Sequence, residues 1–253
     1  DIDALPETLA RPVRQEGNVV TVIEGAEENP QLEGKPFQQT QDAAAPVEPD
    51  RNVPALKAIG RYTIRNVLGR GGWGIVYRAY DEDLKRDVAV KVPRPDVLSR
   101  TPGLAKEYRH EAQVVAQLDH DHIVRIYDVN STDSLPCYLV TQFISGESLA
   151  SKMRGGSLTE VESVELTLAM ADALQHAHSH GVVHRDVKPG NIIVDDDGKP
   201  WLADFGLALD DESLAQKGEY AGTPSYMSPE QAGGEGHRID GRSDVFSLGI
   251  VFY

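Results

Sequence analysis

The sequence predicts an α+β fold with two lobes, an antiparallel sheet carrying one helix and then a mainly helical lobe. Short runs rich in β-branched and aromatic residues, separated by turn residues, occur from residue 62 to residue 143, as is typical of strands. One helical stripe interrupts these runs, and after residue 155 the apolar residues follow a helical spacing. We therefore expect the first lobe over residues 60–145 and an incomplete second lobe over residues 146–253.

Composition allows a normal core and argues against several classes of protein. The chain has 253 residues, of which 40% are hydrophobic, and no window approaches the roughly 18 apolar residues of a membrane span. With 40 acidic and 25 basic residues, there is no excess of cations to bind a nucleic acid. The single cysteine, Cys137, cannot form an internal disulfide. We read it as an apolar filler and expect a reducing, cytoplasmic setting.

The first 55 residues differ in amino-acid composition from the rest. They hold 11 acidic and 4 basic residues and seven prolines, with too little apolar surface to offset the entropy of ordering. We expect an acidic, proline-rich, disordered tail over residues 1–55. Residues 19–23 are read as either a short strand or a docking segment, and a regulatory or partner-binding arm is the functional alternative.

Five strands and one helix are expected in the first lobe. The strands are YTIRNVLG (62–69), GIVYRAYD (74–81), DVAVKV (87–92), IVRIYDV (123–129) and YLVTQF (138–143). Between the third and fourth, apolar residues recur at spacings of three and four, which predicts a helix on the sheet. Its stripe is Leu104, Tyr108, Ala112, Val115 and Leu118.

Two helices are expected in the second lobe. Thr159 and Glu162 fit a capping box, and Val164, Leu168, Ala171 and Leu174 predict a long helix up to Gly181. The run VFSLGIVFY (245–253) predicts an apolar helix. Because the chain opens on Asp1 and stops inside this helix, we expect a fragment of a longer protein.

A glycine-rich hairpin joins the first two expected strands. Residues 69–76, GRGGWGIV, fit G-x-G-x-x-G-x-V. Glycines let the backbone approach a charged ligand and point N–H groups at it. A dinucleotide-binding loop has a similar spacing but opens a helix, whereas a strand follows here. Taken alone, the motif equally fits a hairpin without a ligand.

A lysine lies in the apolar strand beside this hairpin. Lys91 ends the run VAVK, and a buried ammonium needs an anionic partner. Glu111, on the predicted helix, is the natural candidate. A lysine exposed on the surface is the alternative.

Further motifs follow in order, and together they carry a resemblance. HRDVKPGN (184–191) packs charged and polar groups around Asp186, and DFG (204–206), SPE (228–230) and Asp244 within SDVFSLG come after it. With these motifs in this order, the chain resembles the eukaryotic-type (Hanks-type) serine/threonine protein kinases, and the residues within the motifs are similar to those of bacterial members. The resemblance implies a bilobal fold of the protein-kinase type over residues 60–253.

The resemblance also implies ATP and Mg²⁺ as cofactors. Asn191 and Asp204 offer the hard oxygen ligands that suit Mg²⁺. Lys91, held by Glu111, would fix the α- and β-phosphates. Asp186 would align the attacking hydroxyl, and Lys188 would stabilise the transferring group, as in serine/threonine kinases.

The nucleotide would lie between the glycine hairpin and the second lobe. Val76, Ala89 and Ile193 would sandwich the adenine. Thr141 falls at the gatekeeper place, and the backbone of Gln142 and Ile144 would form the hinge. The full set implied for the nucleotide is Leu68, Gly69, Arg70, Gly71, Gly72, Trp73, Gly74, Val76, Ala89, Lys91, Thr141, Gln142, Ile144 and Ile193.

The resemblance gives other residues structural or regulatory roles. His184 would stack with Phe205, Val115 and Ile126 rather than act as an acid or base. Arg185 beside Asp186 resembles kinases whose activation loop is ordered by phosphorylation. In the loop of residues 204–230 we expect autophosphorylation at Ser213 or Thr223.

The predicted function is transfer of the ATP γ-phosphate to serine and threonine hydroxyls of proteins, in signalling. A non-catalytic pseudokinase or interaction module is the alternative, and the presence of Lys91, Asp186, Asn191 and Asp204 favours the enzyme. We expect no nucleic acid partner and no membrane segment in this chain, although bacterial relatives often carry an anchor elsewhere. His120 and His122 invite a metal interpretation, but no third ligand is spaced nearby.

Overall fold

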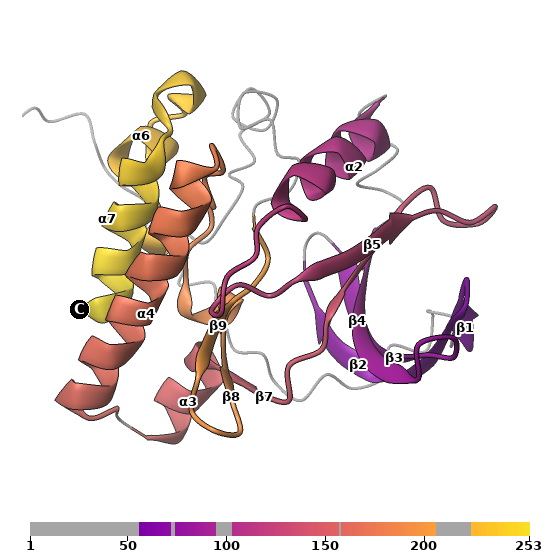
Figure 1. The fold of residues 1–253 in the computed structure, drawn as a ribbon. Coiled ribbons are helices and arrows are strands. Elements are labelled where there is room, and N and C mark those ends of the chain that lie inside the picture. The colour runs from indigo at the N-terminus through magenta and orange to yellow at the C-terminus, as the bar shows by residue number, and fades with distance from the viewer. Residues whose placement is uncertain (1–55, 72–73, 95–102, 157, 206–223) are drawn as a thin grey trace, which may run out of the picture. The chain divides into compact units, whose positions relative to one another are not determined.

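A computed structural model of the chain describes residues 56–71, 74–94, 103–156, 158–205 and 224–253 (Figure 1). The predicted tail of residues 1–55 lies outside these residues. The described elements are a sheet with one helix, followed by helices and a small second sheet. This order confirms the predicted two-lobed α+β fold.

The first lobe is a six-stranded antiparallel sheet in the order β1-β2-β3-β4-β6-β5. Its strands are β1 (Ala58–Ile59), β2 (Tyr62–Arg70), β3 (Gly74–Asp81), β4 (Arg86–Pro93), β5 (Ile126–Asn130) and β6 (Tyr138–Gln142). All five predicted strands are present, and β1 is an additional short edge strand. Their runs of β-branched and aromatic residues suit a pleated, half-buried surface.

The two faces of this sheet have different neighbours because side chains alternate along each strand. One face buries what we call the outer cluster, made of Ile59, Tyr62, Tyr77, Ala79, Val88, Val90, Val92, Tyr138 and Val140. The opposite face, the site face, carries two rows of directly paired residues. The first row is Val76, Lys91 and Leu139, and the second is Arg78, Ala89 and Thr141.

Helix α2 (Leu104–Val115) follows Gly103, whose φ of 95° is in the left-handed region. Its buried residues belong to a second apolar group, the inter-lobe cluster, which also contains Cys137 and Leu139. From the second lobe this cluster takes in Leu149, Leu166, Met170, Ala173, Leu174, Ala177, Ile192, Leu202 and Phe205 among others. Cys137 is fully buried there, as expected of an apolar filler.

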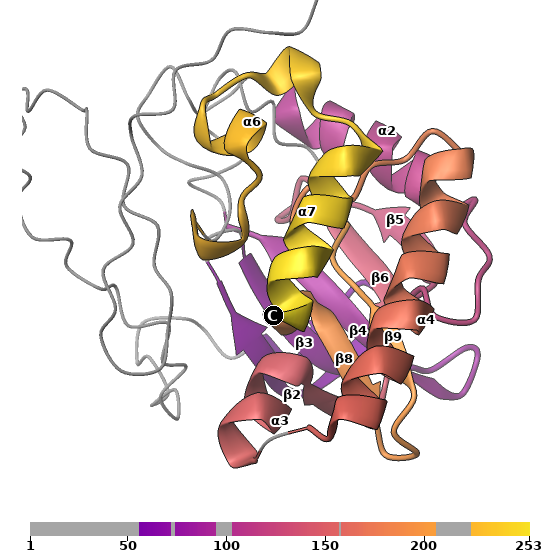
Figure 2. The ribbon, with the colours of Figure 1, turned by 90° about the vertical axis from the view of Figure 1, so that its left-hand side faces the viewer.

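The second lobe is mainly helical. Its elements are β7 (Gly146–Ser148), α3 (Leu149–Gly155), α4 (Glu160–Ser179), η1 (Pro189–Asn191), β8 (Ile192–Asp195), β9 (Pro200–Leu202), η2 (Pro224–Tyr226), α6 (Pro229–Ala232), η3 (Gly236–Arg238) and α7 (Gly241–Phe252). Strands β7, β8 and β9 form a three-stranded antiparallel sheet. Figures 1 and 2 show α7 lying beside α4.

Helix α4 begins and ends close to the predicted positions, but it buries a different face. Thr159 and Glu162 form the predicted capping box, and the helix ends at Ser179. The predicted stripe was right at Leu174, which is 2% exposed, and wrong at Val164 and Leu168, which are 46% and 65% exposed. The buried residues are Leu166, Met170, Ala173, Leu174 and Ala177. Both sets repeat at the helical period, so periodicity alone did not select the face that packs.

Within the described residues, no helix combines the length and the apolar character needed to cross a membrane.

Candidate active site

The HRDVKPGN run connects α4 to β8, and His184 anchors it. This side chain is fully buried, and its ring packs on Phe205 with centroids 4.6 Å apart. Its Nδ1 accepts the backbone N–H of Asp186 at 3.2 Å, so Nε2 carries the proton and donates to the carbonyl oxygen of Ala203 at 3.0 Å. Both ring nitrogens are thus used to hold backbone, which fits a structural role.

Asp244 of α7 holds the same loop through its backbone. Its side chain is 1% exposed, and its two oxygens accept the backbone N–H groups of His184 and Arg185, each at 2.8 Å. The Nε2 atom of His178 lies 2.7 Å from the same carboxylate. Arg185 has a φ of 67°, a conformation that costs a non-glycine residue free energy. The buried carboxylate therefore stabilises a strained turn directly before Asp186.

Three polar side chains converge just after this turn. Asn191 donates from Nδ2 to the carboxylate of Asp186 and to its carbonyl oxygen, both at 2.8 Å. The ammonium of Lys188 lies 3.0 Å from the same carboxylate. Asp186 is consequently held by a cation and an amide, in one orientation.

Lys91 of β4 reaches the segment after β9. Its Nζ lies 2.9 Å from the carboxylate of Asp204, with 21% and 43% of the two side chains exposed. Burial by itself would raise the pKa of Asp204, but the charge and hydrogen bond of Lys91 outweigh it and lower the pKa. Asp204 therefore carries its negative charge at neutral pH. Glu111 lies half-buried in α2, and its pairing with Lys91 stays a prediction.

The glycines of the hairpin differ in what surrounds them. The N–H of Gly71 donates to the carbonyl oxygen of Gly74 at 2.9 Å. A Cβ on Gly74 would lie 2.1 Å from the carbonyl oxygen of Val92, whereas one on Gly69 or Gly71 would meet no described heavy atom within 4 Å. Packing thus requires glycine at position 74, and the other two glycines face open space. Leu68 and Arg70 are exposed, and residues 72–73 lie outside the described ranges.

The residues expected around the base lie on neighbouring strands. Val76, Ala89 and Thr141 are half-buried on the site face. Ile193 is half-buried in β8. Gln142 ends β6, and Ile144 lies in the segment that leads to β7.

Helix α6 connects the HRDVKPGN loop to α7 through hydrogen bonds on both sides. Ser228 caps it, and Gln231 donates from Nε2 to the carbonyl oxygen of Arg185 at 2.7 Å. The carboxylate of Glu230 accepts a hydrogen bond from the Ser243 hydroxyl, which lowers the pKa of Glu230. The predicted phosphorylation sites, Ser213 and Thr223, lie outside the described residues.

Sequence reasoning missed a polar group beside the predicted hinge. The guanidinium of Arg78 lies 2.7 Å from Asp87 and 4.6 Å from the ring centroid of Phe143. The sequence did contain a signal for it. Side chains two residues apart in a strand lie on the same face of the sheet, so Arg78 must share the face of Val76.

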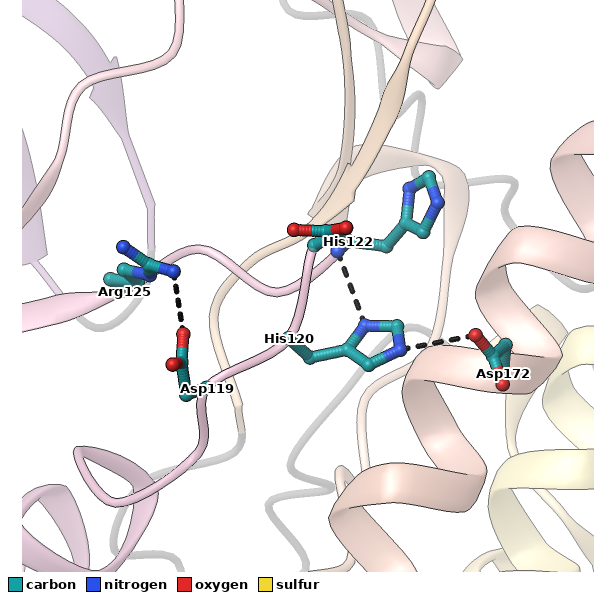
Figure 3. Close-up of a pocket in the computed structure, with 6 residues that line it drawn as sticks. Asp119, His120, His122, Arg125 and Asp172 are labelled. Atoms are coloured by element: carbon teal, nitrogen blue, oxygen red, sulfur yellow. Dashed lines mark hydrogen bonds and ion pairs between the residues drawn. The ribbon is translucent and has the colours of Figure 1, made fainter.

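A separate polar pocket of about 370 Å³ surrounds His120 (Figure 3). It is lined by Asp119, His120, Asp121, His122, Arg125 and Asp172. His120 accepts the backbone N–H of His122 on Nδ1 and donates from Nε2 to Asp172 at 3.1 Å. In the described part of the chain, no group of three His, Cys, Asp or Glu side chains is arranged to hold a metal ion.

The rings continue from this pocket into what we call the histidine row. His120 lies 5.9 Å from His122 and 5.1 Å from His176, and His176 lies 4.4 Å from His180, measured between ring centroids. Burial, followed by the neighbouring imidazoles of His180 and His120, lowers the pKa of His176. The imidazole of His176 therefore favours its neutral form.

Comparison with known families identifies the domain. Residues 62–253 match the protein kinase domain family. The chain belongs to this family. A probable serine/threonine-protein kinase of Streptomyces coelicolor is 39% identical over 203 residues, covering 77% of this chain and 30% of that protein. Serine/threonine-protein kinase PknB of Mycobacterium tuberculosis is 39% identical over 202 residues, covering 76% and 32%.

A solved structure shows the same kinase fold. The kinase domain of PknI from Mycobacterium tuberculosis superposes with a TM-score of 0.65 at 26% identity, over 79% of this chain and 76% of that one. The chain spans about a third of the length of the curated kinases it matches.

Proposed function

We propose that this kinase domain transfers the γ-phosphate of ATP to serine and threonine hydroxyls of protein substrates, in signalling. Two charged groupings carry the proposal. Lys91 pairs with Asp204 at 2.9 Å, and Lys188 and Asn191 hold Asp186. The relatives named serine/threonine-protein kinases support this choice of substrate hydroxyl.

The donor set fits Mg²⁺, which supplies charge neutralisation at the phosphates when bound. Asn191 uses its Nδ2 on Asp186, so its Oδ1 is the atom left to bind a cation. The ionised carboxylate of Asp204 is a second hard oxygen ligand. We assign these two residues to the metal. Lys91 neutralises phosphate charge from the sheet, with Glu111 as its proposed second partner.

Asp186 acts on the attacking hydroxyl in this proposal. Its carboxylate, fixed by Asn191 and Lys188, accepts or aligns the hydroxyl proton. Lys188 places positive charge where the transferring phosphoryl group develops negative charge. Positioning of this kind is the main contribution that a protein makes to phosphoryl transfer.

The nucleotide sites are proposed as predicted from the sequence. The glycine hairpin of residues 68–74 would cover the phosphates, and the open space beside Gly69 and Gly71 supports this. Val76, Ala89 and Ile193 would enclose the base, with Thr141 as gatekeeper and residues 142–144 as hinge.

Transfer of radiolabelled phosphate from γ-labelled ATP to a generic protein substrate tests the proposal. Asp186→Asn and Lys91→Met should each lower kcat/KM by about 100-fold or more. Asp196→Asn changes an exposed carboxylate in the turn between β8 and β9 and should keep full activity. Nucleotide binding without any transfer by the unaltered protein would support a pseudokinase instead.

Phosphopeptide mapping after incubation with Mg-ATP tests autophosphorylation. We propose phosphate on Ser213 or Thr223, and an active preparation with an unmodified loop would refute this. We also propose no nucleic acid partner, supported by the net charge of -15, and a cytoplasmic setting, supported by the presence of a single cysteine. A membrane anchor elsewhere in a longer protein stays a prediction.

A further inference from the structure

Three residues of the first lobe form a connection between the sheet and the hinge, which we call the Arg78 cluster. Arg78 of β3 donates from its guanidinium to the carboxylate of Asp87 in β4 at 2.7 Å. The same guanidinium lies over the ring of Phe143, with its Cζ 4.6 Å from the centroid. Arg78 and Asp87 are 40% and 33% exposed in their side chains, so the cluster is partly shielded from water.

The register of the sheet places this cluster on the site face. Arg78 is paired with Ala89, and Ala89 is paired with Thr141. Phe143 follows Thr141 by two residues, which keeps its side chain on the same face. Phe143 follows β6, which lies on the far side of β4 from β3, so the contact with Arg78 spans the width of β4.

The chemistry suits an arginine in particular. A planar guanidinium can stack on a ring and bind a carboxylate at its edge at the same time, which a lysine ammonium cannot do. The Nε atom of Arg78 is buried with no hydrogen-bond partner among the described residues. The ring and Asp87 therefore account for how this side chain is held.

We propose that Arg78 is a positioning residue for the nucleotide base. It holds Phe143 against the sheet, and so fixes the backbone on either side of Phe143, at Gln142 and Ile144. This inference rests on the proposed function, since residues 142–144 meet a base only if ATP binds in the predicted place. Its effect should be confined to the base end of the nucleotide, because Lys91 and the glycine hairpin serve the phosphates.

Arg78→Leu separates this role from general stability. We expect the KM for ATP and the Kd of a fluorescent adenine nucleotide to rise about 5- to 10-fold, with kcat within about twofold of the unaltered protein. Inhibition by inorganic tripolyphosphate, which lacks a base, should keep its Ki. Arg78→Lys keeps the charge and loses the planar stack, and it should also raise the KM.

Arg86→Leu is the matched control. Arg86 is an arginine of β4 whose Cζ lies 3.6 Å from the ring centroid of Tyr127 in β5. It has the same parity as Val88 and Val90 and so faces the outer cluster. Its loss should lower the melting temperature in the same way as Arg78→Leu and leave the KM for ATP unchanged.

The outcomes separate the two proposals. If the unaltered protein neither binds nucleotide nor transfers phosphate, the proposed function fails. If it does both, and Arg78→Leu matches Arg86→Leu in KM, or weakens tripolyphosphate as much as ATP, the role of Arg78 is refuted. Should Arg78→Leu fail to fold, Asp87→Asn removes the ionic partner at constant size, and the same comparison of KM and Ki decides.

Discussion

Replacing Asp244 tests how far the HRDVKPGN loop (184–191) depends on one buried carboxylate. Asp244→Ala removes the acceptor of two backbone N–H groups, those of His184 and Arg185, which both bind it at 2.8 Å. A buried N–H left without an acceptor costs about 1–3 kcal/mol, so the two together cost about 2–6 kcal/mol. Domains of this kind are stable by about 5–15 kcal/mol, and the loss is therefore a large fraction of the total.

Asp244→Asn provides a graded version of the same experiment. Its single carbonyl oxygen can accept from one of the two N–H groups, while its amide faces the other as a second donor. We expect Asp244→Asn to lower the free energy of unfolding, but by less than Asp244→Ala does. The kcat should fall as well, because the strained turn at Arg185 precedes Asp186 directly.

Urea unfolding, monitored by tryptophan fluorescence, measures this decrease in the free energy of unfolding. Trp201 in β9 donates to Asp195 at 2.9 Å and reports on the second lobe. Asp240→Ala is the control, since Asp240 caps the same helix from an exposed position and its removal should cost much less. A loss below about 1 kcal/mol for Asp244→Ala, or one no larger than that of the control, would refute the reasoning.

Three further changes test other parts of the structure. Gly74→Ala should cost about 1–3 kcal/mol in thermal melts, because its Cβ would lie 2.1 Å from the Val92 carbonyl oxygen; equal behaviour of Gly71→Ala would contradict this. Burial and then Asp128 raise the pKa of Tyr62 to about 12, so the unfolded chain ionises first. Stability should fall from about pH 10 toward 12, and urea titrations of Tyr62→Phe should show a shallower slope; burial also raises the pKa values of Tyr77 and Tyr138, which keep part of it. The lowered pKa of His176 means that unfolding takes up a proton, so stability should fall below about pH 6.5. His176→Phe should flatten the profile between about pH 7 and 5, and an unaltered profile would show that another group titrates.

Local patterns were enough to predict the strands because each obeys its own two-residue period. The run of residues 74–81 became β3 with the predicted bounds. The same reasoning failed for the buried face of α4, since Val164 and Leu166 belong to different stripes of equal period and only the position of a neighbouring helix distinguishes them. The small sheet of β7, β8 and β9 was missed because its strands have only three or four residues.

The candidate site was predictable where its residues are close in sequence or follow a family order. Asp186, Lys188 and Asn191 lie within six positions, and they do converge. The hydrogen bonds of Asp244 join residues 60 and 59 positions apart, which periodicity does not reveal. The Arg78 cluster depends on β6, rather than β5, lying next to β4 in the sheet. The order of the strands in the sequence does not reveal this arrangement.

The inter-lobe cluster has a consequence for dissecting the molecule. Cys137 and Leu139 precede residue 145, yet they belong to the same apolar cluster as residues of α4 and β8, and not to the outer cluster. Cleavage between the lobes would expose that shared surface on both pieces, and neither should fold by itself. Amide hydrogen exchange should accordingly show α2 and α4 opening together, as one cooperative unit, while β1 exchanges earlier as a short edge strand.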